Sequence, residues 1–204
     1  MKNKYVEFIS DDHFIKCVEN LHNAYLKAKK NISKKNFYNN KIDTIKLTFD
    51  SKFNNIDENN LIQAEILRQI DKSINNSIGT FHEEILGGIK DYEVGKLSGF
   101  DIKAKDNSLF ALLIHEKTPV NLNDAIFDKL AKTANIFKNS KCYLVDFTVE
   151  NEKIEKWTLT NDESTVSHKN VYKISSGCFY TLLTGNQNSL KQLSQKTTAM
   201  LKEF

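Results

Sequence analysis

The chain of 204 residues is poor in the residues that divide or interrupt a fold, and each scarcity excludes a class of protein. It has one proline, Pro119, seven glycines, and no Gly/Ser-rich or Pro-rich linker. No apolar run approaches the roughly 18–20 residues that a membrane span needs. Hydrophobic residues still make up 40% of the chain, which excludes wholesale disorder. We therefore expect one soluble domain over residues 1–204.

Cysteine is also scarce, with only Cys17, Cys142 and Cys178 in the chain. Their odd number, their separation and the lack of a CxxC pair argue against a disulfide framework and a structural zinc site. The first 14 residues lack the apolar stretch of a signal peptide, so we expect a cytoplasmic protein. The sequence also lacks the Walker A, GxGxxG and GxSxG motifs.

Arginine is represented by Arg68 alone, although Lys and Arg together number 29. The net charge of +3 and the pI of about 8.6 are compatible with nucleic-acid binding but do not demand it. The abundance of Asn, Ile and Lys is also what an AT-rich genome would produce. The lysine excess therefore has two interpretations, DNA binding and codon bias, and composition does not choose between them.

Periodicity predicts a mostly helical N-terminal part over residues 1–75. Apolar residues recur every three to four positions in Asp11–Lys30 and again in Glu58–Asn75, which indicates two helices. Between them, alternating apolar residues at 45, 47 and 49 predict a short strand. A separate short helix is predicted for Phe81–Ile89, ended by the pair Gly87-Gly88.

Residues 76–150 carry the pattern of a sheet crossed by a helix, and residues 151–204 add further strands and helices. Strands are predicted at Tyr92–Val94, Phe100–Ala104, Leu109–His115, Cys142–Val149, Lys156–Leu159 and Val171–Ile174, and helices at Leu122–Lys138, Cys178–Leu183 and Leu190–Leu201. The turn Asp106-Asn107 makes the second and third strands an antiparallel pair. The order predicts an α/β or mixed α+β fold with a mixed central sheet flanked by helices.

Several segments in this region resemble one enzyme family in order and spacing. They are IGTFHEEILGGI (78–89), GFDI (99–102), FA-x9-N (110–121), CYLVDF (142–147), WTLT (157–160) and FYTLLTG (179–185). Together they are similar to type II restriction endonucleases of the SinI- and AvaII-like group, which cut GGNCC or GGWCC sites and belong to the PD-(D/E)xK nuclease superfamily. The resemblance implies a Mg²⁺-dependent homodimer that hydrolyses double-stranded DNA at a short GC-rich pseudo-palindrome. It also implies a paired cytosine methyltransferase in a restriction–modification system.

The resemblance assigns the family's metal-binding Asp to Asp101, but the next strand departs from the pattern. Leu112 and Ile114 stand where the family has its Glu and Lys. Three explanations stay open. In the first, the roles of the missing Glu and Lys have moved to Glu116 and to Lys103 or Lys117. In the second, the chain is a catalytically degenerate DNA-binding protein. In the third, Glu116-Lys117 is a misaligned remnant of the motif. Glu116 is two strand positions beyond Ile114, roughly 6.6 Å, which is a long way for a ligand to move.

The helix Phe81–Ile89 carries a second acidic group, Glu83-Glu84, whose side chains point about 100° apart. We expect Glu83 to face the site as a metal ligand, although adjacent glutamates are more often a solvated helix face. For DNA contacts we expect His82, Lys117, Thr118 and Asn121, because such side chains bind phosphates and base edges.

Overall fold

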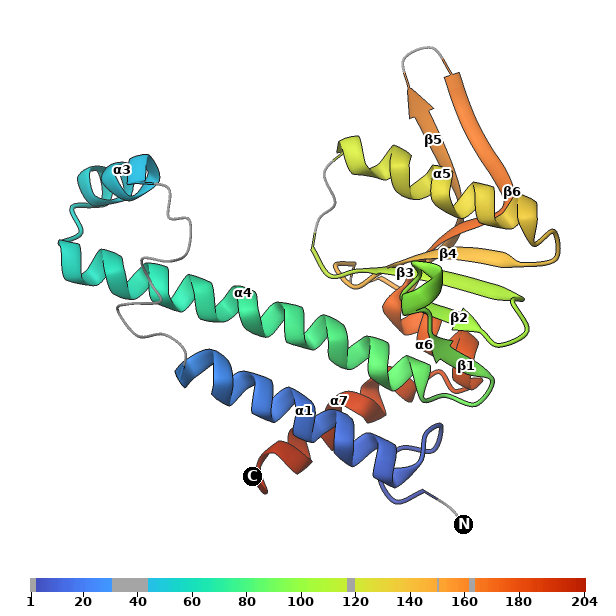
Figure 1. Cartoon of the computed structure of the whole chain (residues 1–204), viewed down its shortest axis with the longest axis horizontal. Helices are drawn as coiled ribbons and strands as arrows, with labels where there is room; N and C mark the ends of the chain where they lie inside the picture. The colour runs from blue at the N-terminus through green and yellow to red at the C-terminus, as the bar shows by residue number, and fades with distance from the viewer. Residues whose placement is uncertain (1–2, 31–43, 117–119, 150, 162–163) are drawn as a thin grey trace. The chain divides into compact units, whose positions relative to one another are not determined.

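The computed structural model describes residues 3–30, 44–116, 120–149, 151–161 and 164–204 (Figure 1). The chain divides into two compact units, one made of Met1–Val18 with Phe81–Phe204 and the other of Glu19–Thr80. Within the described residues, no helix has both the length and the apolar character that a bilayer crossing requires.

The first unit is built on a mixed six-stranded sheet with the order β1-β2-β3-β4-β6-β5. Its strands are β1 Tyr92–Val94, β2 Ile102–Ala104, β3 Leu109–Ile114, β4 Lys141–Asp146, β5 Ile154–Asn161 and β6 Ser164–Ser175. Strands β1, β2 and β3 pair antiparallel, β3, β4 and β6 pair parallel, and β5 returns antiparallel to β6. The predicted mixed sheet is confirmed.

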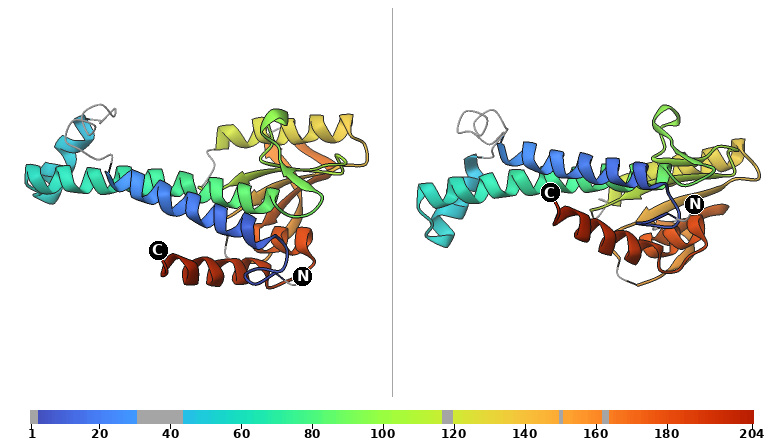
Figure 2. Two further views of the ribbon diagram at one scale, coloured as in Figure 1. Left: turned by 60° about the horizontal axis from the view of Figure 1, so that its bottom comes forward. Right: turned by 90° about the horizontal axis from the view of Figure 1, so that it is seen from below.

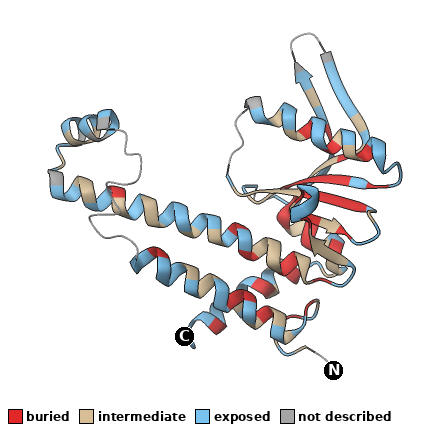
Figure 3. Cartoon of the chain, viewed as in Figure 1, coloured by how far each residue is buried: buried red, intermediate tan, exposed pale blue. Residues whose placement is uncertain are grey.

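Helices cover both faces of this sheet, as the predicted sheet flanked by helices requires. Helix α5, Val120–Ile136, connects β3 to the parallel strand β4, and its Phe127 and Leu130 pack into a buried cluster with Leu144 and Trp157. On the opposite face, Tyr143 of β4 contacts Phe179 of α6, Ser176–Thr184, at a ring separation of 5.9 Å. Helix α7, Ser189–Leu201, follows α6 (Figures 1 and 2). The buried residues concentrate in the strands and in the helix sides that face them (Figure 3).

Helix α4, Glu58–Gly87, is one continuous helix of 30 residues, so the predicted break before Phe81 was wrong. A single glycine inside a helix costs only about 1 kcal/mol, and Ser77 bonds back to the carbonyl of Ser73. The predicted end at Gly87-Gly88 is confirmed, and close packing explains why both residues are glycine. A Cβ on Gly87 would lie 2.4 Å from a methyl group of Val94, and one on Gly88 would lie 2.3 Å from the His13 ring.

The predicted strand around residues 45–49 was also wrong, because Thr44–Asn54 forms helix α3. Side chains four residues apart interact along this helix: Phe49 stacks on Phe53 at 5.5 Å, and Lys46 pairs with Asp50. These contacts need the helical period. Helix α1, Asp11–Lys30, has the predicted bounds.

Candidate active site

Asp101 lies directly before β2, beside the third strand of the sheet. Its backbone N–H donates to the carbonyl of Ala111 at 3.0 Å, and its carboxylate Oδ2 accepts a hydrogen bond from the Leu113 N–H at 2.6 Å. The Asp101 carboxylate thus accepts the Leu113 N–H, which a backbone carbonyl would accept if β2 began earlier. The antiparallel pairing of β2 and β3 predicted from the sequence is confirmed.

Glu83 lies near the end of α4 and is partly buried. Burial and then the charge of Asp101 raise the pKa of Glu83, while Lys96 opposes the shift. Burial also raises the pKa of Asp101, against the lowering effects of the Leu113 N–H, of Lys129 and of His115. Two partly desolvated carboxylates that repel each other form a place where a cation would be stabilised.

Leu112 and Ile114 are partly buried and apolar, so they add no ligand to this acidic pair. Both pack against the buried cluster on the α5 side of the sheet, which includes Phe100, Phe110 and Phe127. Residues two apart on a strand share a face, so the positions at which the family carries its Glu and Lys lie on the side of the hydrophobic core.

The structure disperses the other residues named from the sequence. The ammonium of Lys103 lies 3.3 Å from Asn107 Oδ1 and 3.3 Å from Glu93 Oε1, and so is directed to the β2–β3 turn and to β1. Glu116 is exposed just beyond β3. Lys117 and Thr118 lie outside the described residues, as does the side chain of Asn121 near the start of α5.

His82 belongs to an aromatic cluster with His115, Phe147 and Tyr180. Its Nδ1 lies 2.9 Å from the Tyr180 hydroxyl, and its ring centroid lies 4.5 Å from Phe147 and 5.7 Å from His115. Burial, followed by the neighbouring His115, lowers the pKa of His82 to about 3, so this ring is neutral at physiological pH. Burial also lowers the pKa of His115, although Asp101 opposes that shift.

Lys129 of α5 is a residue that the sequence did not single out. Its ammonium donates to the carbonyl of Gly99 and lies 4.8 Å from the centroid of the Phe100 ring. It also lines a hollow of about 540 Å³ together with Ser98, Phe100, Ala125, Asp128, Lys132 and Thr133. No local pattern connects residues 99 and 129, because only the β2–β3–α5 topology brings them together.

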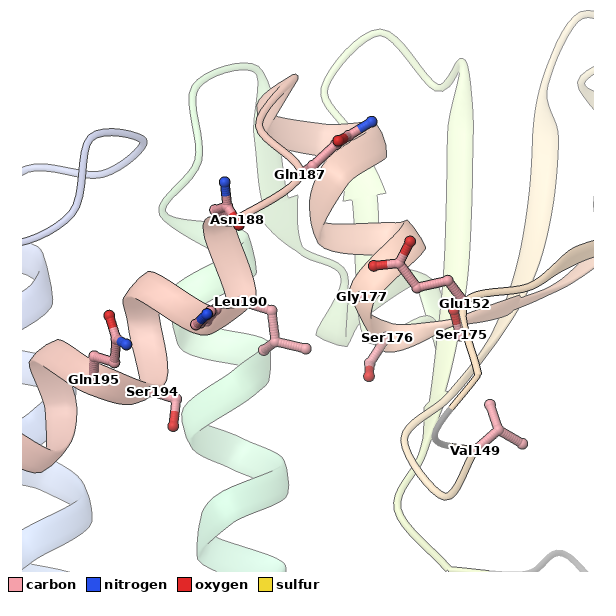
Figure 4. Close-up of a pocket in the computed structure, with 11 residues that line it drawn as sticks. Val149, Glu152, Ser175, Ser176, Gly177, Gln187, Asn188, Leu190, Ser194 and Gln195 are labelled. Carbon is pink, nitrogen blue, oxygen red and sulfur yellow. The ribbon is translucent and has the colours of Figure 1, made fainter.

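A second hollow, of about 510 Å³, lies at the starts of α6 and α7 (Figure 4). Its lining includes Glu152, Ser176, Gly177, Gln187 and Ser194, and neither Asp101 nor Glu83 contributes to it. It is therefore separate from the acidic pair.

The sequence as a whole matches a known enzyme family over nearly its full length. Residues 6–204 match the Eco47II restriction endonuclease family. The chain belongs to this family. It is 33% identical to the type II restriction enzyme Sau96I of Staphylococcus aureus, over 100% of this chain and 82% of that enzyme. It is 28% identical to the type II restriction enzyme Eco47II of Escherichia coli, over 92% of this chain and 83% of that enzyme.

Membership of the Eco47II family confirms the resemblance to type II restriction endonucleases and makes the protein a site-specific deoxyribonuclease. Enzymes of this type generally use a divalent metal ion. Among the described residues, no three His, Cys, Asp or Glu side chains gather into a metal-binding group. The pair Asp101 and Glu83 nevertheless fits a hard cation, because Mg²⁺ is commonly held by one or two carboxylates, with water and substrate phosphates as its other ligands.

Proposed function

We propose that this enzyme hydrolyses double-stranded DNA in a Mg²⁺-dependent reaction, with Asp101 and Glu83 as the metal-binding carboxylates. The observation that carries the proposal is the partly buried Asp101 carboxylate, which the Leu113 N–H holds beside β3 at 2.6 Å and whose charge raises the pKa of Glu83. A divalent ion between them would remove their mutual repulsion, and oxygen ligands favour Mg²⁺ over softer metals. Glu116 is a third candidate for a metal-binding carboxylate, and Lys103 is a candidate for the catalytic ammonium.

Other residues of this chain would position and surround the metal-binding carboxylates. The Leu113 N–H orients the Asp101 carboxylate. His82, His115 and Phe147 form an aromatic cluster next to Glu83 in the chain and to the end of β3. When bound, a metal ion of this kind polarises the phosphate and lowers the pKa of its bound water.

For the DNA site we propose a short GC-rich pseudo-palindrome of the GGNCC type, read by a homodimer. A two-fold symmetric dimer presents the same contacts to both halves of such a site. Arg68, the only arginine, donates through Nε and Nη2 to Glu65 on its own helix, at 2.7 and 2.5 Å. Guanine reading therefore falls to lysine and asparagine, and we assign DNA contacts to Lys117, Thr118 and Asn121, which follow β3.

We further propose that a cytosine methyltransferase protects the same site in the host. Support comes from the resemblance to enzymes of restriction–modification systems. The test is to express the chain with and without a methyltransferase of GGNCC specificity and to compare host viability. Equal toxicity in both hosts would contradict the pairing.

Cleavage of a plasmid that carries GGNCC sites tests the catalytic part of the proposal. We expect defined fragments with Mg²⁺, none with EDTA, and loss of cleavage in Asp101→Asn and in Glu83→Gln. Asp124→Asn, which changes an exposed acid on α5, is the matched control. Cleavage by Asp101→Asn at the native rate would show that the active site lies elsewhere.

A second candidate function is sequence-specific DNA binding without cleavage. The packing of Leu112 and Ile114 into the hydrophobic cluster favours it, because these positions lack the strand carboxylate and lysine. A salt titration on short duplexes separates the two functions, since phosphate contacts make binding fall steeply with salt. Specific binding with no cleavage in either Mg²⁺ or Mn²⁺ would support this second function.

A further inference from the structure

The hollow of about 510 Å³ beside α6 is lined by the beginning of that helix (Figure 4). Ser175, Ser176 and Gly177, which are the N-cap and the first two residues of α6, all contribute to its wall. The Ser175 side chain makes no capping hydrogen bond, and the first turn of α6 contains no acidic residue. The first N–H groups of a helix have no acceptor within it, so they place a partial positive charge at this hollow.

The hydroxyl of Ser176 is buried at the same place and lacks a partner. Ser176 is 9% exposed, and its Oγ makes no hydrogen bond to any residue that the structure describes. Figure 4 shows this oxygen directed from α6 into the hollow. A buried hydroxyl without a partner costs free energy. A ligand oxygen in the hollow would provide the acceptor that Ser176 lacks.

Charged and polar side chains complete the wall. Lys191 and Ser194 of α7 line the hollow together with Glu152, which is exposed. Glu152 lies beside the start of α6, since its Oε1 would be 3.6 Å from a Cβ on Gly177. A carboxylate is stabilised beside a helix N-terminus. Glu152 therefore marks a position that favours an anionic group, and it would compete with an anion that binds there.

The start of α6 lies at the same edge of the sheet as Asp101. Strands β3, β4 and β6 are parallel, and their last paired residues, Ile114, Asp146 and Ser175, are in register. Asp101 is held at the end of β3 by the Leu113 N–H. Neighbouring strands lie about 4.8 Å apart, so the three spacings from β2 to β6 amount to roughly 14 Å. This is about four base-pair steps of 3.4 Å, so a duplex at Asp101 has other backbone phosphates within reach of α6.

We propose that this hollow binds a backbone phosphate of duplex DNA, away from the scissile bond. This inference rests on the proposed nuclease function. The Ser176 hydroxyl and the first N–H groups of α6 donate to the phosphate oxygens, and Lys191 supplies positive charge. Such a contact positions the duplex without reading its sequence. A free phosphate or nucleotide offers the same chemistry, and the experiment distinguishes it from DNA.

The test uses three variants of the full chain, Ser176→Ala, Lys191→Met and Glu152→Gln, with two matched controls. Ser189→Ala removes another buried hydroxyl without a partner, and Lys196→Met removes another α7 ammonium; neither residue lines the hollow. Affinity for a GGNCC duplex and for a scrambled duplex is measured in Ca²⁺ over a range of salt. Single-turnover cleavage at saturating DNA and thermal unfolding are measured on the same proteins.

The expected changes have opposite signs at opposite charges. Ser176→Ala should weaken duplex binding about tenfold, because it removes a hydrogen bond to a charged group. Lys191→Met should weaken binding to both duplexes alike and lower the salt slope by about 0.9. Glu152→Gln should tighten binding about two- to fivefold.

Other properties of these variants should not follow DNA affinity. The maximal cleavage rate should stay native in all three, since the phosphate is not the scissile one. The melting temperature of Ser176→Ala should equal or exceed that of the native chain, as for Ser189→Ala, because each variant loses a buried hydroxyl without a partner.

The outcomes separate this inference from the function on which it rests. If Ser176→Ala and Lys191→Met bind duplexes as the native chain does, the phosphate site is overturned and the nuclease function stands. Equal weakening in Lys191→Met and Lys196→Met would also overturn it, because general charge would then explain binding. If the native chain neither binds nor cuts DNA, both proposals fail.

A titration with inorganic phosphate and with a mononucleotide tests the other source of the ligand. If either binds the native chain but not Ser176→Ala, while both proteins bind the duplex equally, the site serves a free ligand and the proposal is overturned. Should Ser176→Ala unfold, the comparison of Lys191→Met with Lys196→Met decides: weaker DNA binding by the first alone supports the phosphate site.

Discussion

The two flanks of β3 have opposite chemistry. Towards α5, Leu112 and Ile114 extend a hydrophobic cluster centred on Phe110 and Trp157. Beside β2, the Asp101 carboxylate accepts the Leu113 N–H of β3, and its charge acts on Glu83. In the family that this chain resembles, the strand itself carries charged residues. Here the described charges near the site come from the segment before β2 and from the neighbouring helices.

β3 thus carries packing residues where the resemblance places charged ones, and in an active enzyme another element would have to supply that charge. The resulting hypothesis is specific: the acidic flank is needed for chemistry, and the hydrophobic flank is needed for stability. Substitutions can therefore test the acidic pair and the hydrophobic cluster separately.

The largest effect is expected at the acidic flank. Asp101→Asn should lower the cleavage rate about 1,000-fold, because a metal-bound oxygen contributes several kcal/mol to transition-state stabilisation and each 1.36 kcal/mol is a factor of ten. The amide oxygen can still accept the Leu113 N–H, so the fold should persist. Single-turnover kinetics and circular dichroism check the two halves of this prediction. A loss of fold together with activity would assign Asp101 a structural role.

The hydrophobic flank is tested by restoring the family's residues. Leu112→Glu with Ile114→Lys should destabilise the protein by about 3 kcal/mol, because each change places a polar group against an apolar cluster. The control Leu112→Met with Ile114→Val keeps both side chains apolar and should cost less than about 2 kcal/mol. Urea unfolding measures both. A double variant that is as stable as the native chain and cuts DNA faster would show that β3 can still face the active site.

The aromatic backing of the acidic flank predicts an acid sensitivity. The pKa of His82 is lowered from 6.5 to about 3, so the unfolded chain binds a proton in this range and the folded chain does not. Stability is therefore present above about pH 6.5 and is lost as the pH falls, by about 2 kcal/mol at pH 5. Urea unfolding at several pH values measures this loss. His82→Gln should flatten the profile between pH 7 and 5, and an unchanged slope would contradict the buried neutral state.

Local signals predicted most of the fold. The strands around the Asp106-Asn107 turn, the crossover helix and the helix at Cys178–Leu183 were all recognisable, since turns and periodicity act over few residues. The segment at residues 45–49 was misread because three alternating apolar residues do not show whether a partner strand exists. The region 77–80 was misread because one glycine cannot end a helix that its other contacts stabilise.

The site was less predictable than the fold. Asp101 and Glu83 were named through a resemblance, and only the structure showed that the charge of Asp101 raises the pKa of Glu83. Lys129 carried no signal at all, because its partner Gly99 is 30 residues away and the contact depends on how α5 lies over the sheet. The clustering of His82 with His115 and Phe147 likewise depends on tertiary packing of residues that share no motif.

The smallest expected effect concerns stability at Glu83, where function and folding oppose each other. Burial and Asp101 raise the pKa of Glu83, so the folded state holds its proton more firmly than the unfolded state. Stability from this group is therefore present at pH values below its unfolded pKa and falls as the pH rises through its folded pKa. Glu83→Gln removes that loss and should raise the melting temperature slightly near neutral pH, while lowering cleavage. Glu155→Gln, at an exposed position on β5, is the control. The prediction fails if Glu83→Gln melts lower than native enzyme at neutral pH but not at pH 4. The ionised carboxylate would then stabilise the fold, so that Glu83 and Asp101 would not repel each other.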